Sequence, residues 1–460
     1  MLDLIVIGGG AAGYAAALRT AQLGGKVILV EKEKLGGTCL HRGCIPSKVL
    51  YWQSAVVEDY RTALKSGLFA GEGAINLKAV ADRQDKVVQQ LYLGLEDLFR
   101  QRDIPVVHGC ALVEGVGRVR VEGVKKEVCL SRNILIANGS RERTFTFSPM
   151  EGVQGAEESL KLPQQPCRVA VIGGGNTGLE LASAYASFGF SVTVMEKEKV
   201  LLPALQDEEI SKWLGFLIKR RGLKIVTGTV LHNIDQAEKD GKRELKIMFS
   251  RAGKEQVLCV DLIINASGRE PRLDVFAPGC VGVKHTANGI IVNNLMETST
   301  KGIYAAGDVT GSPMLAHRAY FEGITAAENV MGMARELDWR AVPACLSARP
   351  GVAWVGLTEQ QAREEGLHPQ VGRFPFSASG AAVLKEEEEG FIKLIAGEDG
   401  VILGMQVLGN AAEELIMEGT LAVRHGLSVK QLRETIHPHP TRHESIWEAC
   451  LSLEGFPMHG

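Results

Sequence analysis

Two segments of the chain share the same order of apolar and glycine-rich stretches. Residues 4–33 read LIVIGGGAAGYAAALRTAQLGGKVILVEKE, and residues 168–198 read RVAVIGGGNTGLELASAYASFGFSVTVMEKE. Each runs from an apolar strand through a glycine turn and an alanine-rich helix to a second apolar strand that ends in an acidic residue. The pattern predicts one βαβ unit that occurs twice, at a spacing too long for a solenoid repeat.

The glycines of the first unit have the spacing of a dinucleotide-binding turn. Gly8 permits the tight turn, Gly10 lets the backbone approach a pyrophosphate, and Gly13 lets the helix pack close to the strand. The helix N-terminus then offers free N–H groups to the phosphates. Glu31 ends the second strand and can accept hydrogen bonds from a ribose. The alternative is a glycine turn in an ordinary α/β sheet. Such a turn does not require a strand before it, a helix after it and an acidic residue about 20 positions on.

The second unit repeats these positions with Gly173, Gly175, Gly178 and Glu196. An acidic residue at the end of the second strand suits the ribose hydroxyls of NAD and repels the additional phosphate of NADP. Two lysines follow Glu196 closely, so NADP stays an alternative to NAD.

Composition predicts three domains in an α/β chain. Residues 141–166 are rich in Pro, Glu, Ser and Gln and have no clear period. Beyond residue 338 the runs GVAWVGLT, GFIKLIA and VILGMQVLG predict strands, followed by helices and no nucleotide motif. We expect two Rossmann-like domains, the first discontinuous (1–144 and 269–337) and the second at 145–268. A C-terminal α+β domain should occupy residues 338–460.

The overall composition excludes several classes of function. The 460 residues carry a net charge of −3, so no general basic field attracts nucleic acid or an anionic membrane. The chain enters its first strand directly, and no apolar run has the length of a membrane span. The nine cysteines are odd in number and mostly isolated, which is typical of a reducing compartment. We expect a cytoplasmic protein with no nucleic-acid or membrane partner.

A close cysteine pair lies in the segment GGTCLHRGCIPSK. In a regular helix, Cys39 and Cys44 would be separated by about 7.5 Å along the axis, whereas a disulfide requires Cα atoms within about 7 Å. The turn must therefore be distorted, which Gly43 permits. A disulfide across so short a loop adds little stability and suits opening and closing. The alternatives are two unpaired buried cysteines or half of a metal site, for which no second ligand pair stands at a convincing position.

Three residues near the pair are expected to favour a thiolate. Pro46 fits the first turn of a following helix. The dipole at the N-terminus of that helix, together with Arg42 and Lys48, should stabilise a negative sulfur.

Seven segments in order resemble the FAD-dependent pyridine-nucleotide disulfide oxidoreductases, and among them the dihydrolipoamide dehydrogenases. They are VIGGGAAG, GGTCLHRGCIPSK, IANGS, VIGGGNTGLE, TSTKGIYAAGDV, PMLAHRA and HPHPTRHE. The cysteine segment and HPHPTRHE are specific, whereas many flavoproteins share the glycine motifs. The resemblance covers essentially the whole chain. It implies that the first domain binds FAD, the second binds NAD and the third forms a homodimer.

The resemblance also implies roles for individual residues. Cys44 would be the sulfur next to the flavin and Cys39 the interchange sulfur that meets the substrate. Lys48 would lie near the flavin, paired with Glu180, and Asp308 would bind the ribityl chain. The full set of implied cofactor-binding residues is Gly8, Gly10, Gly13, Glu31, Lys32, Gly37, Thr38, Lys48, Ala111, Gly139, Gly173, Gly175, Gly178, Glu180, Glu196, Gly268, Asp308 and Ala316.

His439 is the expected acid/base, with Glu444 five residues on to orient it. Dithiol oxidation must remove a proton so that a thiolate can attack the disulfide. A histidine suits this task, and a carboxylate partner fixes its tautomer. His437 and His443 lie nearby, so a metal site and a purely structural role stay as alternatives. The resemblance implies that His439 reaches the disulfide of the other subunit.

The segment between the cysteines departs from the family pattern. His41 and Arg42 stand where the family usually has Asn and a small or apolar residue. This pair adds charge near the disulfide, and we expect it to lower the thiol pKa values or to favour an acidic substrate. Other departures occur at Asn138, at 176–177 and at 348–351.

The resemblance implies FAD-dependent oxidation of dihydrolipoamide with hydride transfer to NAD. The dithiol could be free or carried by a dihydrolipoyl domain or an H-protein-like carrier. One alternative is an NAD(P)H-dependent reductase of another small disulfide. An alternative from a different class is a flavoprotein that senses redox state or binds a partner without turnover.

Overall fold

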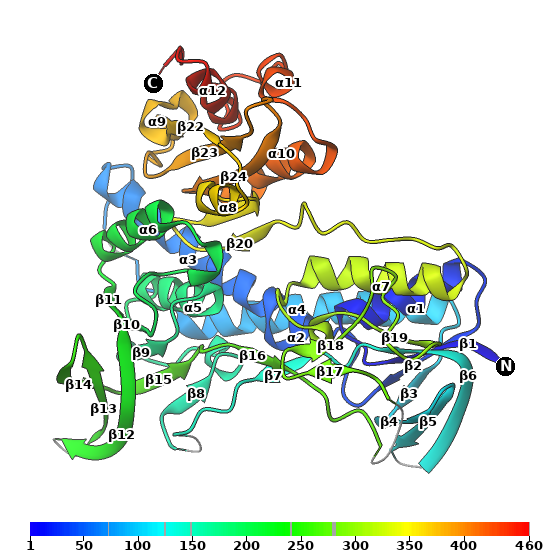
Figure 1. Cartoon of the computed structure of the whole chain (residues 1–460). Coiled ribbons are helices and arrows are strands. Elements are labelled where there is room, and N and C mark those ends of the chain that lie inside the picture. The colour runs from blue at the N-terminus through cyan, green and yellow to red at the C-terminus, as the bar shows by residue number, and fades with distance from the viewer. Residues whose placement is uncertain (72, 124–125, 148–149, 240–241, 278–281, 460) are drawn as a thin grey trace. The chain divides into compact units, whose positions relative to one another are not determined.

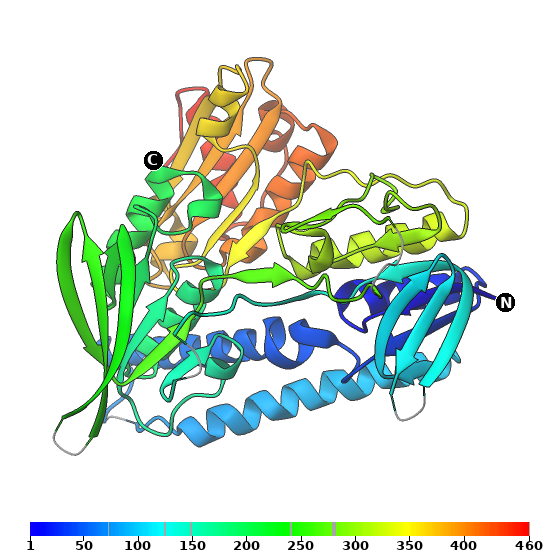
Figure 2. The same ribbon diagram turned by 60° about the horizontal axis from the view of Figure 1, so that its bottom comes forward.

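The computed structural model describes residues 1–71, 73–123, 126–147, 150–239, 242–277 and 282–459. The chain forms two compact units (Figures 1 and 2). The first unit consists of Met1–Val49, Ala79–Arg143 and Gly268–Asp338. The second unit consists of Leu50–Lys78, Thr144–Ser267 and Trp339–Gly460. Each unit is described by itself below.

The first unit is built on a mixed sheet with the order β3-β2-β1-β6-β5-β4, in which β19 also pairs with β6. Strands β2, β1, β6 and β19 are parallel, as expected for strands joined by helices. β4, β5 and the first half of β6 form an antiparallel meander. The strands are β1 (Leu2–Ile7), β2 (Val27–Glu31), β3 (Val106–His108), β4 (Cys110–Gly115), β5 (Arg118–Glu122), β6 (Lys126–Ile136) and β19 (Ile303–Ala305).

Helices α1 (Ala11–Gln22) and α7 (Ala316–Val330) lie side by side in the first unit. They approach so closely that a Cβ atom on Gly323 would lie 2.1 Å from the carbonyl oxygen of Ala12. Two short ladders, β7 (Ser140–Glu142) with β16 (Arg269–Pro271) and β17 (His285–Thr286) with β18 (Gly289–Ile290), complete the unit. Helices α2 (Gly37–Arg42), α3 (Cys44–Lys65) and α4 (Leu77–Gln101) follow β2.

The nucleotide-binding part of the second unit contains a parallel sheet with the order β11-β10-β9-β15-β8. Its central strands are mostly apolar and buried, as is typical of a sheet covered on both faces. An antiparallel meander, β12-β13-β14, extends from it. The elements are β8 (Val153–Gly155), β9 (Arg168–Ile172), α5 (Asn176–Ser187), β10 (Ser191–Glu196), α6 (Glu208–Arg220), β11 (Lys224–Thr227), β12 (Thr229–Lys239), β13 (Lys242–Arg251), β14 (Lys254–Val260) and β15 (Leu262–Asn265).

The C-terminal part of the second unit is an antiparallel sheet with the order β20-β21-β24-β23-β22. Helices α10 and α12 pack against it (Figure 1). The elements are β20 (Ala344–Leu346), β21 (Val352–Gly356), α8 (Glu359–Glu364), β22 (Gln370–Pro375), α9 (Gly380–Val383), β23 (Phe391–Ala396), β24 (Ile402–Leu408), α10 (Ala412–His425), α11 (Val429–Arg433) and α12 (Glu444–Leu453).

The predicted fold class is confirmed. Both predicted βαβ units are present, β1-α1-β2 and β9-α5-β10, and each forms parallel strand pairs. The three apolar runs predicted as C-terminal strands are β21, β23 and β24. The division into three domains with the boundaries given above stays a prediction.

Candidate active site

The two glycine turns have the same steric construction. In the first turn Gly8 has a φ of +100°, and a Cβ atom on Gly13 would lie 1.8 Å from the Gly8 carbonyl oxygen. In the second turn Gly173 has a φ of +118°, and a Cβ atom on Gly178 would lie 1.9 Å from the Gly173 carbonyl oxygen. Only glycine fits these positions, as the sequence predicts.

The middle glycine of each turn borders open space. No heavy atom lies within 4 Å of the Cβ position of Gly10 or Gly175. Each of these residues precedes a helix whose N-terminal N–H groups have no side-chain cap. Open space beside uncapped N–H groups is what a pyrophosphate needs, so both turns fit the diphosphate of a dinucleotide.

Each acidic strand end folds back onto its glycine turn. Glu31 accepts hydrogen bonds from the Gly9 N–H (2.6 Å) and the Glu33 N–H (2.8 Å). Glu196 accepts them from the Gly174 N–H (2.5 Å) and the Glu198 N–H (2.8 Å). A carboxylate has about four acceptor sites, so each retains capacity for ribose hydroxyls.

The charges beside Glu196 bear on the choice between NAD and NADP. The Lys197 ammonium lies 3.7 Å from the carboxylate of Glu198, and both side chains are exposed. The carboxylate of Glu196 is buried. A 2′-phosphate would therefore approach a buried negative charge, which favours NAD.

The cysteine segment begins beside the first glycine turn. The Gly36 N–H donates to the Gly9 carbonyl (2.8 Å), and a Cβ atom on Gly37 would lie 2.7 Å from the Gly10 Cα atom. Gly37 and Thr38 open α2, which contains Cys39. This contact places the redox segment directly against the turn that fits a pyrophosphate.

Cys39 and Cys44 lie on two helices separated by one residue. Helix α2 ends at Arg42, Gly43 has backbone angles outside the helical region, and Cys44 begins α3. Their side chains are hydrogen-bonded to each other. The predicted break at Gly43 therefore brings together two sulfurs that a continuous helix would separate.

The expectation that the thiolate is favoured is wrong at Cys39. Its hydrogen bond with Cys44 and its burial raise the pKa of the Cys39 thiol. The Lys48 ammonium acts in the opposite direction but does not outweigh them. Arg42 does not contribute as predicted because its charge is paired with Glu33. Of two hydrogen-bonded thiols, one keeps its proton.

The remaining cofactor residues predicted in the first unit lie on several elements. Asp308 accepts a hydrogen bond from Ser140 Oγ (2.5 Å). The carbonyl of Gly139 accepts a hydrogen bond from the Arg272 N–H, and the carbonyl of Gly268 accepts one from the Arg143 N–H. Both hydrogen bonds lie next to the β7–β16 ladder. Ala111 pairs with Val121 in the meander, Ala316 begins α7, and Lys32 is an exposed residue 3.6 Å from the Glu33 carboxylate. Their contact with FAD stays a prediction.

Glu180 and Lys48 belong to different units. Glu180 lies on α5 and accepts a hydrogen bond from the Ser347 N–H (3.0 Å). Lys48 lies on α3, one turn after Cys44. The ion pair between them stays a prediction.

His439 and Glu444 lie as predicted in contact. His439 Nδ1 is 2.9 Å from Glu444 Oε1, and Glu444 Oε2 accepts from the Thr441 N–H (2.8 Å). Burial would raise the pKa of the Glu444 carboxyl, but the hydrogen bonds from Thr441 and His439 outweigh it and the pKa is lowered. The ionised carboxylate holds Nδ1 and leaves Nε2 of His439 for a substrate.

A second carboxylate that sequence reasoning missed holds the neighbouring histidines. Glu418 on α10 lies 2.8 Å from His437 Nε2 and 3.2 Å from His443 Nδ1. His437 also contacts the Thr435 carbonyl (2.9 Å). Glu418 therefore fixes the segment on both sides of His439. No group of three or more metal-ligating side chains occurs among the described residues, and these histidines contact carboxylates instead.

Replacing His437 with Gln should destabilise the protein more at low pH than at high pH. The hydrogen bond to Glu418 raises the pKa of His437 above its ordinary value near 6.5. A raised pKa contributes stability that is fully present below the ordinary value and is lost as pH rises through the folded-state value. We expect a loss of roughly 1–3 kcal/mol at pH 6 and a smaller loss at pH 9, measured by denaturant unfolding. A loss that grows with pH would contradict this account.

Two further contacts near the site had no local sequence signal. Glu322 is fully buried and accepts the Gly307 N–H (2.5 Å), which fixes the turn that carries Asp308. The hydroxyls of Tyr14 and Tyr320 are 2.8 Å apart. Burial raises the pKa of Tyr14, and both cysteines add to this effect, so the tyrosine pair lies within electrostatic range of the sulfurs.

The other departures from the family pattern have structural partners. Asn138 Nδ2 donates to the Arg272 carbonyl (3.0 Å), and Asn176 Nδ2 donates to the Cys345 carbonyl (2.6 Å). Arg349 forms an ion pair with Asp59.

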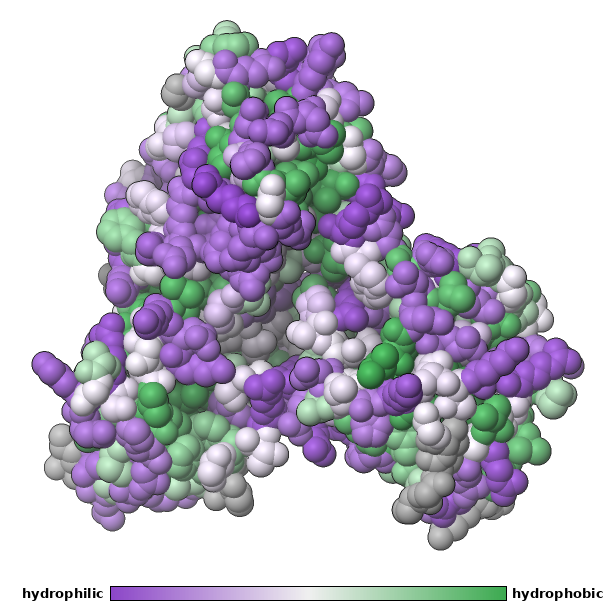
Figure 3. All heavy atoms as spheres, viewed as in Figure 1, coloured by the Kyte–Doolittle hydropathy of each residue, from purple (hydrophilic) through white to green (hydrophobic). Residues whose placement is uncertain are grey.

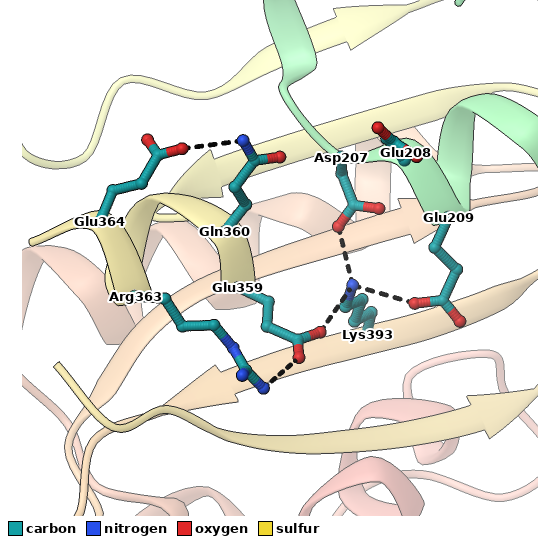
Figure 4. A pocket seen from close by; sticks show the side chains of 8 residues that line it. All are labelled: Asp207, Glu208, Glu209, Glu359, Gln360, Arg363, Glu364 and Lys393. Carbon is teal, nitrogen blue, oxygen red and sulfur yellow. Dashed lines mark hydrogen bonds and ion pairs between the residues drawn. The ribbon is translucent and has the colours of Figure 1, made fainter. Parts of the chain in front are cut away.

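A cavity in the second unit surrounds the buried Lys393 (Figure 4). The ammonium of Lys393 lies 2.8 Å from Asp207, 2.9 Å from Glu209 and 3.2 Å from Glu359. Burial would lower the pKa of Lys393, but the carboxylates of Asp207 and Glu209 outweigh it and the pKa is raised. Asp207 also caps α6 by accepting the Ile210 N–H. The cluster joins α6, α8 and β23, and its groups bind one another.

Replacing Lys393 with Met should destabilise the protein by about 3–5 kcal/mol, because the buried Asp207 would lose its cation and three carboxylates would repel. Unfolding by denaturant measures the change. Arg363→Met is the matched control, since Arg363 pairs with Glu359 at the exposed rim of the same cavity. The control should cost less than about 1 kcal/mol. Equal effects of the two variants would contradict the account.

Fold and site together define a class of protein. Two turns fit dinucleotides, a pair of adjacent thiols lies against one of them, and a histidine–carboxylate pair is present. These features define a flavin- and nicotinamide-dependent disulfide oxidoreductase. The chain belongs to the pyridine nucleotide-disulphide oxidoreductase family, whose profile matches residues 2–323. It is therefore an enzyme that uses FAD and NAD(H).

Residues 342–450 match the dimerisation domain of the same family, which supports a homodimer. In the described part of the chain, no helix has the length and apolar character needed to span a membrane.

Similar proteins cover the chain from end to end. The dihydrolipoyl dehydrogenase of Thermus scotoductus is 39% identical over 461 residues, which cover 99% of this chain and 98% of that protein. A dihydrolipoyl dehydrogenase of Bacillus subtilis is 36% identical over 480 residues and covers 99% of both chains. Among solved structures, the Cu(II) complex of the HOCl-induced flavoprotein disulfide reductase RclA from Escherichia coli has a TM-score of 0.86. It is 25% identical and covers 98% of this chain and 99% of that chain.

Proposed function

We propose that the protein oxidises dihydrolipoamide to lipoamide and passes the electrons to NAD through the Cys39–Cys44 pair. The observation that carries this proposal is the hydrogen-bonded thiol pair next to the glycine turn of the first unit. The similarity to dihydrolipoyl dehydrogenases over the whole chain supports the choice of dithiol.

The cysteines carry out the thiol–disulfide exchange. A thiolate of the substrate attacks the Cys39 sulfur of the disulfide, and the Cys39–Cys44 bond breaks to leave Cys44 as a thiolate. The second substrate thiol then attacks the mixed disulfide, which releases lipoamide and leaves both cysteines reduced. FAD, for which Glu31 and the glycines of the first turn form the proposed site, would supply a two-electron acceptor for the dithiol and a hydride donor for NAD. The disulfide closes again and one proton is released.

His439 takes the proton from the attacking thiol at its Nε2 atom. Glu444 holds Nδ1 at 2.9 Å, which fixes the ring orientation and stabilises the imidazolium that forms. Lys48 and Glu180 are proposed to lie beside the flavin. Glu31, Glu196 and the glycines of both turns are proposed to hold FAD and NAD.

The proposed enzyme is a homodimer in which His439 serves the disulfide of the partner subunit. The His439 side chain is 79% exposed, and Ile436 beside it is 95% exposed. Met417 and Leu421 are exposed one turn apart on α10. Hydrophobic side chains also gather over this part of the second unit in Figure 3, in the region of β24 and α10. Such a face is typical of a surface that a partner covers.

The carrier of the dithiol is proposed to be a dihydrolipoyl domain or an H-protein-like protein. An exposed acid/base suits a substrate that arrives on a flexible arm. A cytoplasmic location stays a prediction from the cysteine pattern.

Steady-state kinetics with purified holoenzyme test the proposal. Dihydrolipoamide with NAD should support turnover, whereas NADP should be at least about tenfold poorer because of the buried Glu196. The same protein is assayed with NADPH and glutathione disulfide. Turnover with that pair and none with dihydrolipoamide would contradict the proposal and favour a reductase of another small disulfide. Flavin reduction without turnover on either substrate would favour a redox-sensing flavoprotein.

A further inference from the structure

The residues between the two cysteines are held from three sides. Leu40 is buried in the core of the first unit. His41 Nε2 donates to the Leu35 carbonyl (2.7 Å), and its ring meets the ring of Tyr92 on α4 edge-on, with centroids 5.3 Å apart. The Lys34 ammonium lies 5.3 Å from the centroid of the same Tyr92 ring.

Arg42 is held by the segment that precedes α2. Its Nη1 atom lies 2.5 Å from Glu33 Oε2. The Arg42 guanidinium holds the pKa of the Glu33 carboxyl below its usual range. The charge of Arg42 is thus compensated within the protein, which argues against recognition of an acidic substrate by this residue.

None of these contacts involves a cysteine side chain, so they do not depend on whether the two sulfurs are bonded. The side chains of Cys39 and Cys44 lie close enough to form a hydrogen bond. The anchored loop therefore holds the two sulfurs close together. Two thiols held at this separation form a disulfide more readily than two thiols on a mobile loop.

We propose that His41 and Arg42 are positioning residues that keep the reduced Cys39–Cys44 loop closed and thereby lower the reduction potential of its disulfide. The anchors are Glu33 for Arg42, and the Leu35 carbonyl and Tyr92 for His41. This proposal rests on the proposed function of the cysteine pair, and it assigns a positioning role to the charged residues His41 and Arg42 between the two cysteines.

The test is the thiol–disulfide equilibrium of the holoenzyme in redox buffers, read by alkylation of Cys39 and Cys44 and mass spectrometry. Glu33→Gln and Arg42→Met should each lower the equilibrium constant for disulfide formation by about threefold, or about 15 mV, because the ion pair is exposed. Tyr92→Ala should lower it by about tenfold, or about 30 mV. The double variant with Glu33→Gln and Arg42→Met should show little more than the effect of either substitution alone, because both substitutions remove the same ion pair.

The sign of the Arg42→Met effect separates this proposal from an electrostatic one. Loss of an anchor favours the dithiol. Loss of a positive charge that stabilises a thiolate would instead favour the disulfide. A rise in the equilibrium constant for Arg42→Met would therefore overturn the proposal, as would unchanged constants in all three variants.

Matched variants serve as controls. Tyr92→Phe keeps the ring beneath His41 and loses only the hydroxyl bond to Glu96 (2.5 Å), so it should stay within about twofold of the wild type. Arg42→Lys keeps a cation able to pair with Glu33 and should restore most of the wild-type value. In denaturant all variants should give equal constants. The measurement needs no turnover, so its failure is distinguishable from failure of the lipoamide assay.

Discussion

Cys44→Ser should lower dihydrolipoamide oxidation by at least about a thousandfold, because serine cannot form the disulfide that accepts the two electrons. The glycine turn and Glu31 do not include Cys44, so the variant should retain its flavin. Its NADH-dependent reduction of a one-electron acceptor such as ferricyanide should stay within about fivefold of the wild type, since that route does not require a disulfide.

Cys450→Ser provides the control for Cys44→Ser. Cys450 is buried in the core of the C-terminal part of the second unit, and burial raises the pKa of its thiol to about 12. It should be inert in turnover. Full lipoamide turnover in Cys44→Ser, or an equal loss in both variants with normal flavin content, would contradict the assignment of the redox pair.

His439→Gln should lower turnover by roughly a hundredfold to ten-thousandfold, which is the range for loss of a general base. The remaining rate should increase with pH up to about 9, because the substrate thiol then ionises without a base. Glu444→Gln keeps a hydrogen-bonding group next to Nδ1 but loses its charge. It should cost about tenfold, and the rate should be measured across the same pH range.

His232→Gln is the matched control for the acid/base. His232 also contacts a carboxylate, at 3.5 Å from Glu255, but it lies on the β12–β14 meander. Its replacement should change turnover by less than about twofold. If His439→Gln kept the wild-type rate and pH profile, another group would have to accept the proton of the substrate thiol, which would contradict the assignment of His439.

The parts of the site that sequence predicts are those with short, strict spacing. The glycines, Glu31 and Glu196 belong to βαβ units of about 30 residues, and their roles follow from strand and helix geometry. The break at Gly43 follows from the distance that a disulfide allows. Glu444 follows His439 by five residues at the start of α12, so their contact is local.

The parts that sequence does not predict depend on distant neighbours. The sequence around Tyr92 does not indicate that its ring contacts His41. The sequence around Glu418 likewise does not indicate that its carboxylate contacts two histidines. We expected a lowered pKa for the Cys39 thiol, but the hydrogen bond with Cys44 and burial raise it more than Lys48 lowers it. The relative size of these effects depends on distances and burial in the folded protein. Lys393 did leave a signal: a single charge within the apolar run GFIKLIA indicates a buried ion that needs partners.

The most direct test of the central claim is a stepwise reaction followed by alkylation. Oxidised holoenzyme is mixed anaerobically with one equivalent of dihydrolipoamide, quenched with an alkylating agent and analysed by mass spectrometry, with and without later addition of NAD. The account predicts that Cys39 and Cys44 become labelled together as lipoamide forms. It also predicts that NAD abolishes the labelling while an equal amount of NADH appears. Formation of lipoamide and NADH with both cysteines unlabelled throughout would contradict it.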